Sequence, residues 1–166
     1  MSNDLQNLEG FLKVKGPAMR SYYDEILSYS SSQETKKVLK VETDVEGRSG
    51  IRRIKIRNHQ ILADSPKEWC GYNLGASAPE MLLGSLTACI SHMYLVVAGM
   101  KRISLVSLSV EASGSLDLRN GMKGFENKVP GIEDLNYTVH IESNENDEVL
   151  RSLHQEVEKI CPLYVS

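Results

Sequence analysis

Residues 75–100 have the sequence GASAPEMLLGSLTACISHMYLVVAGM, and this stretch decides the fold. Pro79 stands near its start and Gly99 near its end, which is the order that helices favour: proline in the first turn and glycine at the end. Most residues between them are apolar, but polar and small residues interrupt the run. We therefore predict a buried core helix over residues 79–99, and not a membrane span.

The segments before this helix have a β-like pattern. We expect three strands there, at residues 38–45, 51–57 and 60–63. Residues 46–50 form a turn in which Gly47 and Gly50 can supply unusual φ values, and Asn58-His59 marks a second turn. Three short strands joined by turns predict an antiparallel meander.

The segments after the helix predict two more strands and a second helix, at residues 105–118, 135–142 and 148–160. Gly114 marks a break in the first of these strands, and Asn146-Asp147 can cap the helix. The order is meander, helix, strands, helix. This order predicts an α+β fold with segregated layers, and not a fold of alternating βαβ units.

The N-terminal part differs from the rest of the chain. We interpret residues 1–37 as a helical appendage and residues 38–166 as one domain. Within the appendage, Pro17 is expected to begin a helix that runs to Ser28. The first residues are polar and lack the pattern of a secretory signal.

Composition excludes several classes of protein. The chain has 166 residues, a net charge of −3 and 41% hydrophobic residues, which excludes collagen, coiled-coil rods and wholly disordered chains. The acidic balance argues against a nucleic-acid partner, and the apolar helix is not expected to enter a membrane. Three scattered cysteines do not make a secreted disulfide framework, so we expect a cytoplasmic protein.

Two of the cysteines carry the strongest chemical signal. Cys89 lies in the middle of the apolar helix, and Cys161 follows the last helix directly before Pro162, where a helix has to stop. A held thiol beside a mobile thiol suits a peroxidase in which one sulfur becomes a sulfenic acid and the other condenses with it. The alternative is that Cys89 is simply a small core residue.

Two charged residues could support a reactive thiol. A cysteine needs nearby positive charge to lower its pKa, and Arg48 in the turn at 46–50 could supply it. Glu80 opens the helix that carries Cys89 and could orient the arginine. The alternative is that Glu80 only complements the helix dipole.

Four segments together resemble the OsmC-like family. A proline-containing loop at 64–68 leads to the stretch 75–89, in which Pro-Glu-Met-Leu-Leu precedes small residues and a cysteine. Ile160-Cys161-Pro162 resembles the family's second motif, a helix that ends in Cys-Pro. Gly47-Arg48-Ser49-Gly50 resembles its Gly-Arg-x-Gly turn. The resemblance covers roughly residues 38–162, and the combination is more specific than any one motif.

The resemblance implies an α+β fold with antiparallel β-sheets packed on two central helices, in an intertwined homodimer with its active sites at the dimer interface. It also implies thiol-dependent reduction of organic hydroperoxides in oxidative-stress defence. Cys89 would be the peroxidatic cysteine and Cys161 the resolving one. Arg48 would stabilise the thiolate, and Glu80 would hold Arg48. The reductant would be a dithiol such as a dihydrolipoyl group, with no cofactor or metal.

Two other functional hypotheses stay open. One is a non-catalytic OsmC-like dimer that binds a small apolar ligand between its subunits. The other is a redox sensor that forms the same disulfide slowly. Cys70, the third thiol, is interpreted as incidental. In the loop before the apolar helix, Trp69 and Tyr72 could line a peroxide pocket or simply cover the core.

Overall fold

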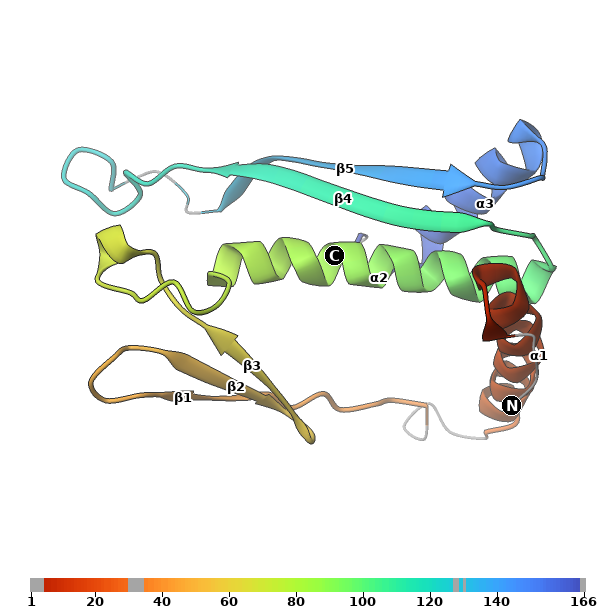
Figure 1. Ribbon diagram of the computed structural model, residues 1–166, viewed down its shortest axis with the longest axis horizontal. Helices are drawn as coiled ribbons and strands as arrows, with labels where there is room; N and C mark the ends of the chain where they lie inside the picture. The colour runs from red at the N-terminus through yellow and green to blue at the C-terminus, as the bar shows by residue number, and fades with distance from the viewer. Residues whose placement is uncertain (1–4, 30–34, 127–128, 130, 165–166) are drawn as a thin grey trace. The chain divides into compact units, whose positions relative to one another are not determined.

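The computed structural model describes residues 5–29, 35–126, 129 and 131–164 (Figure 1). Its elements in chain order are α1 (Leu8–Leu27), β1 (Glu42–Val45), β2 (Arg52–Ile56), β3 (His59–Ala63), the 3₁₀ turn η2 (Lys67–Trp69), α2 (Ala78–Lys101), β4 (Ser107–Leu116), β5 (Ile132–Glu142) and α3 (Asp147–Ile160). The predicted α+β class and the order meander, helix, strands, helix are confirmed. The chain forms two compact units, one of residues 29–83 and one that joins the segment up to Ser28 with residues 84–166.

The unit of residues 29–83 contains the predicted meander. Its sheet has the order β1-β2-β3 with antiparallel pairs, such as Glu42 opposite Lys55 and Ile56 opposite His59. The turn between β1 and β2 closes through the N–H of Gly50, which donates to the carbonyl of Glu46 at 3.0 Å. Gly50 has φ of 71°, the left-handed value that glycine adopts without strain.

The first strand is shorter than predicted, because β1 starts at Glu42 and not at residue 38. The partner strand β2 determines where β1 can start. Glu42 pairs with Lys55, and β2 ends one residue later at Ile56, where the chain turns into β3. The apolar residues at 38–41 favour a strand by composition, but the hairpin after β2 removes the backbone with which they would pair.

The other unit is built around residues 84–101 of α2. Ile90, Tyr94 and Ala98 follow one another at intervals of four residues on this helix, and each is at most 2% exposed. They pack with Leu105 after the helix and with Leu153 of α3 in one hydrophobic cluster. Partly buried residues of β4 and β5 face the same cluster. The core therefore lies where α2 and α3 meet the β4–β5 hairpin.

Two local sequence signals in this unit are confirmed. The register of β4 and β5 shifts between Ser113 and Ser115, at the break predicted for Gly114. Asn146 caps α3, because its side-chain oxygen accepts a hydrogen bond from the N–H of Val149 at 3.0 Å.

The N-terminal helix begins earlier than predicted. It starts at Leu8, where the Asn7 side chain accepts from the N–H of Gly10 at 2.8 Å, and Pro17 lies inside it. The prediction that Pro17 begins the helix is therefore wrong: the Asn7 cap starts the helix at Leu8, nine residues earlier, and the helix tolerates the proline. Helix α1 crosses the C-terminal end of α2 within one compact unit (Figure 1). The division into an appendage at 1–37 and a domain at 38–166 stays a prediction.

Glycines make the crossing of α1 and α2 close. A Cβ atom on Gly16 would lie 2.0 Å from the carbonyl oxygen of Gly99, a distance that no side chain allows. Arg20 adds to this contact, since its Nη1 donates to the carbonyl of Met100 at 2.8 Å. The last carbonyls of α2 have no partners within the helix, so this guanidinium satisfies one of them. Leu12 of α1, 4% exposed, joins the core cluster.

Helix α2 is long and apolar enough to cross a membrane by length and composition. The central helix of a packed core passes the same test. Seven of its residues are buried inside the protein, including Leu86, Ile90 and Val97. These residues support the prediction that α2 is a core helix.

Candidate functional site

The structure brings Cys89 and Cys161 together. The sulfur of Cys161 lies 3.5 Å from the sulfur of Cys89, and both thiols are free. A disulfide has sulfurs about 2.05 Å apart, so the pair is unbonded but within a small movement of a bond. The two residues are 72 positions apart in sequence and come from the middle of α2 and the end of α3.

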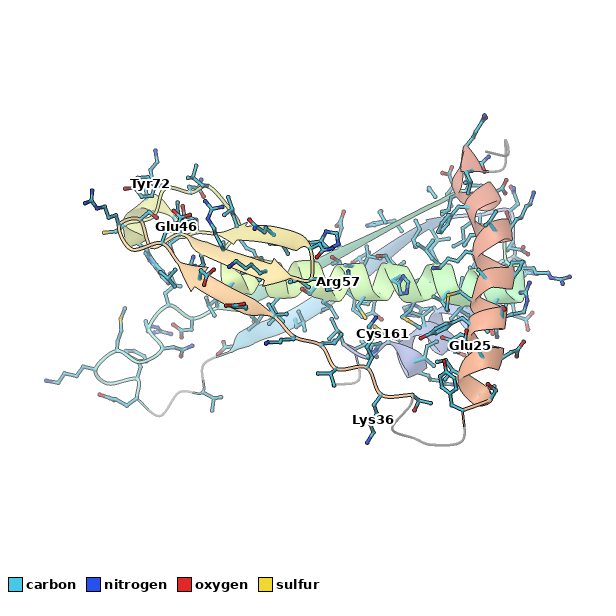
Figure 2. The ribbon with its side chains drawn as sticks, turned by 90° about the horizontal axis from the view of Figure 1, so that it is seen from below. Glu25, Lys36, Glu46, Arg57, Tyr72 and Cys161 are labelled. Carbon is cyan, nitrogen blue, oxygen red and sulfur yellow. The ribbon has the colours of Figure 1, made fainter. Side chains whose placement is uncertain are left out.

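Proline fixes the position of Cys161. Cys161 ends α3 with φ of −71° and ψ of 112°, an extended conformation that the following Pro162 favours. Its N–H still donates to the carbonyl of Val157 at 2.9 Å, so the last helical turn is closed. The side chain is 1% exposed, and Figure 2 labels it at the end of α3.

The two cysteines differ in exposure. The sequence predicts a held thiol on the apolar helix and a mobile thiol at the helix end, with burial of Cys89 in the core as the alternative. In the structure Cys161 is buried and Cys89 is partly exposed. Cys89 lies on the side of α2 that the core covers incompletely. Of the two sulfurs, the one on α2 is therefore more open to a dissolved molecule.

The surroundings of Cys89 raise the pKa of its thiol. Burial is the largest cause, and the neighbouring Cys161 adds to it, while the backbone N–H of Leu163 acts in the opposite direction. A hydrogen-bond donor lowers a thiol pKa because it stabilises the thiolate. Within its own unit, the Cys89 thiol is thus held mainly in the protonated form at neutral pH.

A cavity with a mixed polar and apolar lining adjoins this site. It has a volume of 310 Å³ and is lined by Leu86, Leu135, Asn136, Tyr137, Leu163 and Tyr164. Leu86 lies one helical turn before Cys89, and the N–H of Leu163 acts on the Cys89 sulfur. The leucines of this cavity therefore offer an apolar group a contact surface next to the more exposed thiol, beside the amide of Asn136 and two phenols.

Arg48 lies in the turn that was predicted for it. The turn joins β1 to β2, and the N–H of Ser49 donates to the carbonyl of Glu46 at 3.3 Å. The Arg48 side chain is exposed. Arg48 belongs to the unit of residues 29–83, and Cys89 belongs to the other unit.

Glu80 makes its described contacts with the start of its own helix. Its Oε2 accepts from the N–H and from the hydroxyl of Ser77, each at 2.7 Å. This is a capping-box contact, and it lowers the pKa of Glu80. Nine residues of α-helix rise about 13 Å, so Glu80 does not reach Cys89 along α2.

A polar cluster beside the cysteines was missed by the sequence argument. The hydroxyl of Tyr94 on α2 contacts Nδ1 of His154 on α3, and the hydroxyl of Tyr137 donates to Glu158 at 2.6 Å. Glu158 lies one helical turn before Cys161. The sequence offers one signal for this cluster, the i,i+4 spacing of His154 and Glu158. The residues that complete it come from distant segments.

The pKa values of Tyr94, Tyr137 and Glu158 in this cluster are shifted from their ordinary values. Burial and the charge of Glu158 raise the pKa of Tyr94 to about 12. The pKa of Tyr137 is also raised, first by burial and then by its hydrogen bond to Glu158. The same hydrogen bond lowers the pKa of Glu158. The Tyr137 hydroxyl therefore stabilises the Glu158 carboxylate, and the charge of that carboxylate favours the neutral form of both phenols.

The loop before α2 is organised by one buried carboxylate. Asp64 is 1% exposed and accepts from the N–H groups of Ser65, Tyr72 and Leu74 at 2.7, 3.0 and 3.1 Å. Tyr72, labelled in Figure 2, is 58% exposed, and Trp69 is 62% exposed. Cys70 is exposed with φ of 58°. In this unit the two aromatic rings face solvent and do not cover a core.

The described residues contain no group of three or more histidine, cysteine, aspartate or glutamate side chains placed to hold a metal ion. The chemistry available at the site is that of two neighbouring thiols, an adjoining cavity with leucine, tyrosine and asparagine walls, and a polar cluster of tyrosines, histidine and glutamate.

Solved structures with the same fold are known. An OsmC-like protein from Mycoplasma pneumoniae has a TM-score of 0.67 and 21% identity, over 78% of this chain and 86% of its own. An organic hydroperoxide resistance protein from Legionella pneumophila has a TM-score of 0.56 and 18% identity, over 78% and 88%. A further such protein, from Elizabethkingia anophelis with thiocyanate bound, has a TM-score of 0.60 and 18% identity, over 80% and 89%. At these identities the likeness shows the fold.

Sequence comparison gives two further results. No curated protein matches the sequence of this chain at a significant level. The family model described as OsmC-like protein matches residues 71–166, which is more than half of the chain and includes both Cys89 and Cys161. The chain therefore belongs to the OsmC-like family, as the motifs of its sequence indicated.

Proposed function

We propose that this protein is a thiol-dependent peroxidase that reduces organic hydroperoxides. The observation that carries the proposal is the distance of 3.5 Å between the sulfurs of Cys89 and Cys161. Two free thiols from distant segments meet at the distance from which a disulfide can form. The organic hydroperoxide resistance proteins from Legionella pneumophila and Elizabethkingia anophelis, which share the fold, support this choice of substrate.

The proposed cycle has three steps. The Cys89 thiolate attacks the terminal oxygen of a hydroperoxide, the O–O bond breaks, and the alkoxide takes up a proton and leaves as an alcohol. Cys89 is then a sulfenic acid. The Cys161 thiol attacks this sulfur, a disulfide forms and water leaves. An external dithiol, such as a dihydrolipoyl group, reduces the disulfide by exchange and becomes a disulfide itself.

Exposure supports the assignment of the two cysteines. The attacking sulfur has to meet a dissolved peroxide, and Cys89 is partly exposed while Cys161 is 1% exposed. The N–H of Leu163 favours the thiolate of Cys89. Cys161 has to meet only Cys89, so its burial does not hinder its role.

The raised pKa of Cys89 means that the site needs positive charge. We propose that Arg48 stabilises the Cys89 thiolate and that Glu80 holds Arg48, in the active site of an intertwined homodimer. An arginine stays protonated at all relevant pH values and can bind a thiolate and a carboxylate together. This role requires the Glu80 carboxylate to add an arginine to its contact with Ser77, and a carboxylate has lone pairs for both.

The leucines of the cavity beside Cys89 support a preference for bulky hydroperoxides. Leu86, Leu135 and Leu163 line it beside the more exposed thiol. Each methylene group that a substrate buries there contributes about 0.8 kcal/mol. Hydrogen peroxide has no such group. We propose that the protein works in oxidative-stress defence in the cytoplasm, where a dithiol reductant is available.

One observation favours a second function. The raised pKa of Cys89 reduces the thiolate fraction at neutral pH, which would slow attack on peroxide. If no cation reaches Cys89, the protein would act as a slow redox sensor that forms the same disulfide without rapid turnover. Rate and substrate preference separate the two functions.

The test is mass spectrometry after one equivalent of cumene hydroperoxide without reductant. The peroxidase predicts rapid loss of two hydrogens, which peptide mapping assigns to a bond between Cys89 and Cys161. Cys70→Ser is the matched control and should behave as the wild type, whereas Cys89→Ser should not react. Unchanged thiols, or oxidation spread over all three cysteines, would contradict the proposal. The sensor would be indicated if the same disulfide formed slowly and its rate of formation were the same with hydrogen peroxide as with cumene hydroperoxide.

A further inference from the structure

A second cavity lies at the other end of α2, beside the crossing with α1. It has a volume of 370 Å³, within the range of small-molecule pockets. Its walls come from α1, from the end of α2 and from the residues that follow α2, all in one compact unit. Leu12, Pro17 and Ile103 supply apolar wall. None of the residues that line it lines the cavity near Cys89.

Three cationic side chains share this cavity. They are Lys13 and Arg20 of α1 and Arg102, which directly follows α2. Lys13 and Arg102 are exposed, and within the described residues neither side chain has an ion-pair partner. Two unpaired cations at the rim of an apolar cavity therefore leave positive charge available to a ligand.

The other two charged side chains of the cavity, Glu9 and Arg20, already make hydrogen bonds within the protein. Glu9, its one carboxylate, accepts a hydrogen bond from the hydroxyl of Ser104. Arg20 bonds the last carbonyls of α2 through Nη1, and this contact offsets the partial negative charge of the helix end. A guanidinium has five N–H donors, so Arg20 keeps donors for a second partner. The cavity as a whole stays cationic.

We propose that this cavity binds a small organic carboxylate with an unbranched apolar tail. Lys13 and Arg102 hold the carboxylate at the rim, and the tail lies against Leu12, Pro17 and Ile103. A bare inorganic anion would leave the apolar walls uncovered, and a neutral lipid would leave the two cations unpaired. An amphipathic carboxylate satisfies both parts of the cavity.

Octanoate is the probe, titrated into the full chain by calorimetry and followed by amide chemical shifts. We expect one saturable site, with shifts at the residues of α1 and at 99–104. Shortening the probe from octanoate towards butanoate should weaken binding by about fourfold per methylene. Added salt should weaken binding too, because it screens exposed charges. Both series use the unmodified protein, so they do not depend on any variant folding.

Two charge variants test the carboxylate contacts. Lys13→Gln and Arg102→Gln should each weaken octanoate binding by about tenfold, the value of one hydrogen bond to a charged group. Lys15→Gln is the matched control on the same helix. The ammonium of Lys15 lies 5.7 Å from the centre of the Phe11 ring and does not line the cavity, so this variant should bind as the wild type.

Several outcomes would overturn the proposal. One is the absence of saturable octanoate binding. A second is equal weakening by all three lysine and arginine variants, which would indicate a general charge effect. A third is binding of inorganic phosphate as tight as that of octanoate, which would indicate an unspecific anion site. Shifts confined to the residues around Cys89 would place the ligand in the other cavity. None of these readouts depends on peroxidase activity.

Discussion

The hydroxyl of Tyr94 contacts Nδ1 of His154, and this contact joins the two helices that carry the cysteines. Tyr94 lies five residues after Cys89 on α2, and His154 lies seven residues before Cys161 on α3. Tyr94 is 1% exposed, so His154 is the main described partner of its hydroxyl. The geometry of the thiol pair therefore depends on a polar contact inside an apolar core.

Removing this hydroxyl should destabilise the protein. We expect Tyr94→Phe to lower the free energy of unfolding by about 1–2 kcal/mol, since it leaves a half-buried imidazole nitrogen unpaired. Urea unfolding measures the change. Tyr22→Phe, at a tyrosine that is 52% exposed, is the control and should change stability little. Equal effects of the two variants would show that the contact contributes nothing specific.

Stability should fall in alkaline solution. The pKa of Tyr94 is about 12 in the folded protein, against about 10 in an unfolded chain. The unfolded chain loses this proton first, so the stabilisation is complete below about pH 10 and is lost as pH rises towards 12. Tyr137 acts in the same direction. Urea titrations between about pH 9 and 11 should show the fall, and Tyr94→Phe should reduce it. A fall of the same size in both proteins would contradict the assignment to Tyr94.

The crossing of α1 and α2 should not tolerate a side chain at Gly16. Its Cβ would lie 2.0 Å from the Gly99 carbonyl oxygen, so Gly16→Ala must separate the helices. We expect a loss of about 2 kcal/mol or more in unfolding free energy, or release of α1 to proteases. Gly84→Ala on α2 is the control, because a Cβ there meets nothing within 4 Å. It should be neutral or stabilising by up to about 1 kcal/mol. Full stability of Gly16→Ala would mean that α1 does not pack as described.

The proposed role of Arg48 predicts a shift in the pH profile of peroxide reduction. The rate of Cys89 oxidation should rise with pH, because the thiolate is the reactive form. Arg48→Gln should move the midpoint upward and slow the reaction at pH 7 by about tenfold for each pKa unit. Stopped-flow measurements with cumene hydroperoxide give the profile. Arg57→Gln, in the other turn of the same sheet, is the control. An unchanged midpoint in Arg48→Gln would remove Arg48 from the site.

Local signals made much of the fold predictable. Gly114 marked the irregularity in β4, and Asn146 marked the start of α3, because a bulge and a cap each depend on a few neighbouring residues. The start of α1 was missed because Pro17 is a strong signal for a helix start and Asn7 a weaker one. The start of β1 was missed because it depends on where β2 ends and not on residues 38–41.

The site was predictable only in part. Motif spacing singled out Cys89 and Cys161, and the structure brings their sulfurs together. The relative exposure of the two thiols could not be predicted, because α3 and the core around Leu153 bury Cys161. The roles of Arg48 and Glu80 stay predictions. The cluster around Glu158 combines residues from α2, β5 and α3, which no local pattern connects.

The nearness of the two sulfurs would also limit oxidative damage to the enzyme that we propose. A sulfenic acid on Cys89 has two competing fates, condensation with a thiol or attack by a second peroxide that gives the irreversible sulfinic acid. A thiol held 3.5 Å away acts at an effective molarity far above any dissolved peroxide concentration. Irreversible inactivation of the enzyme that we propose would therefore require that Cys161 be absent, alkylated or already oxidised.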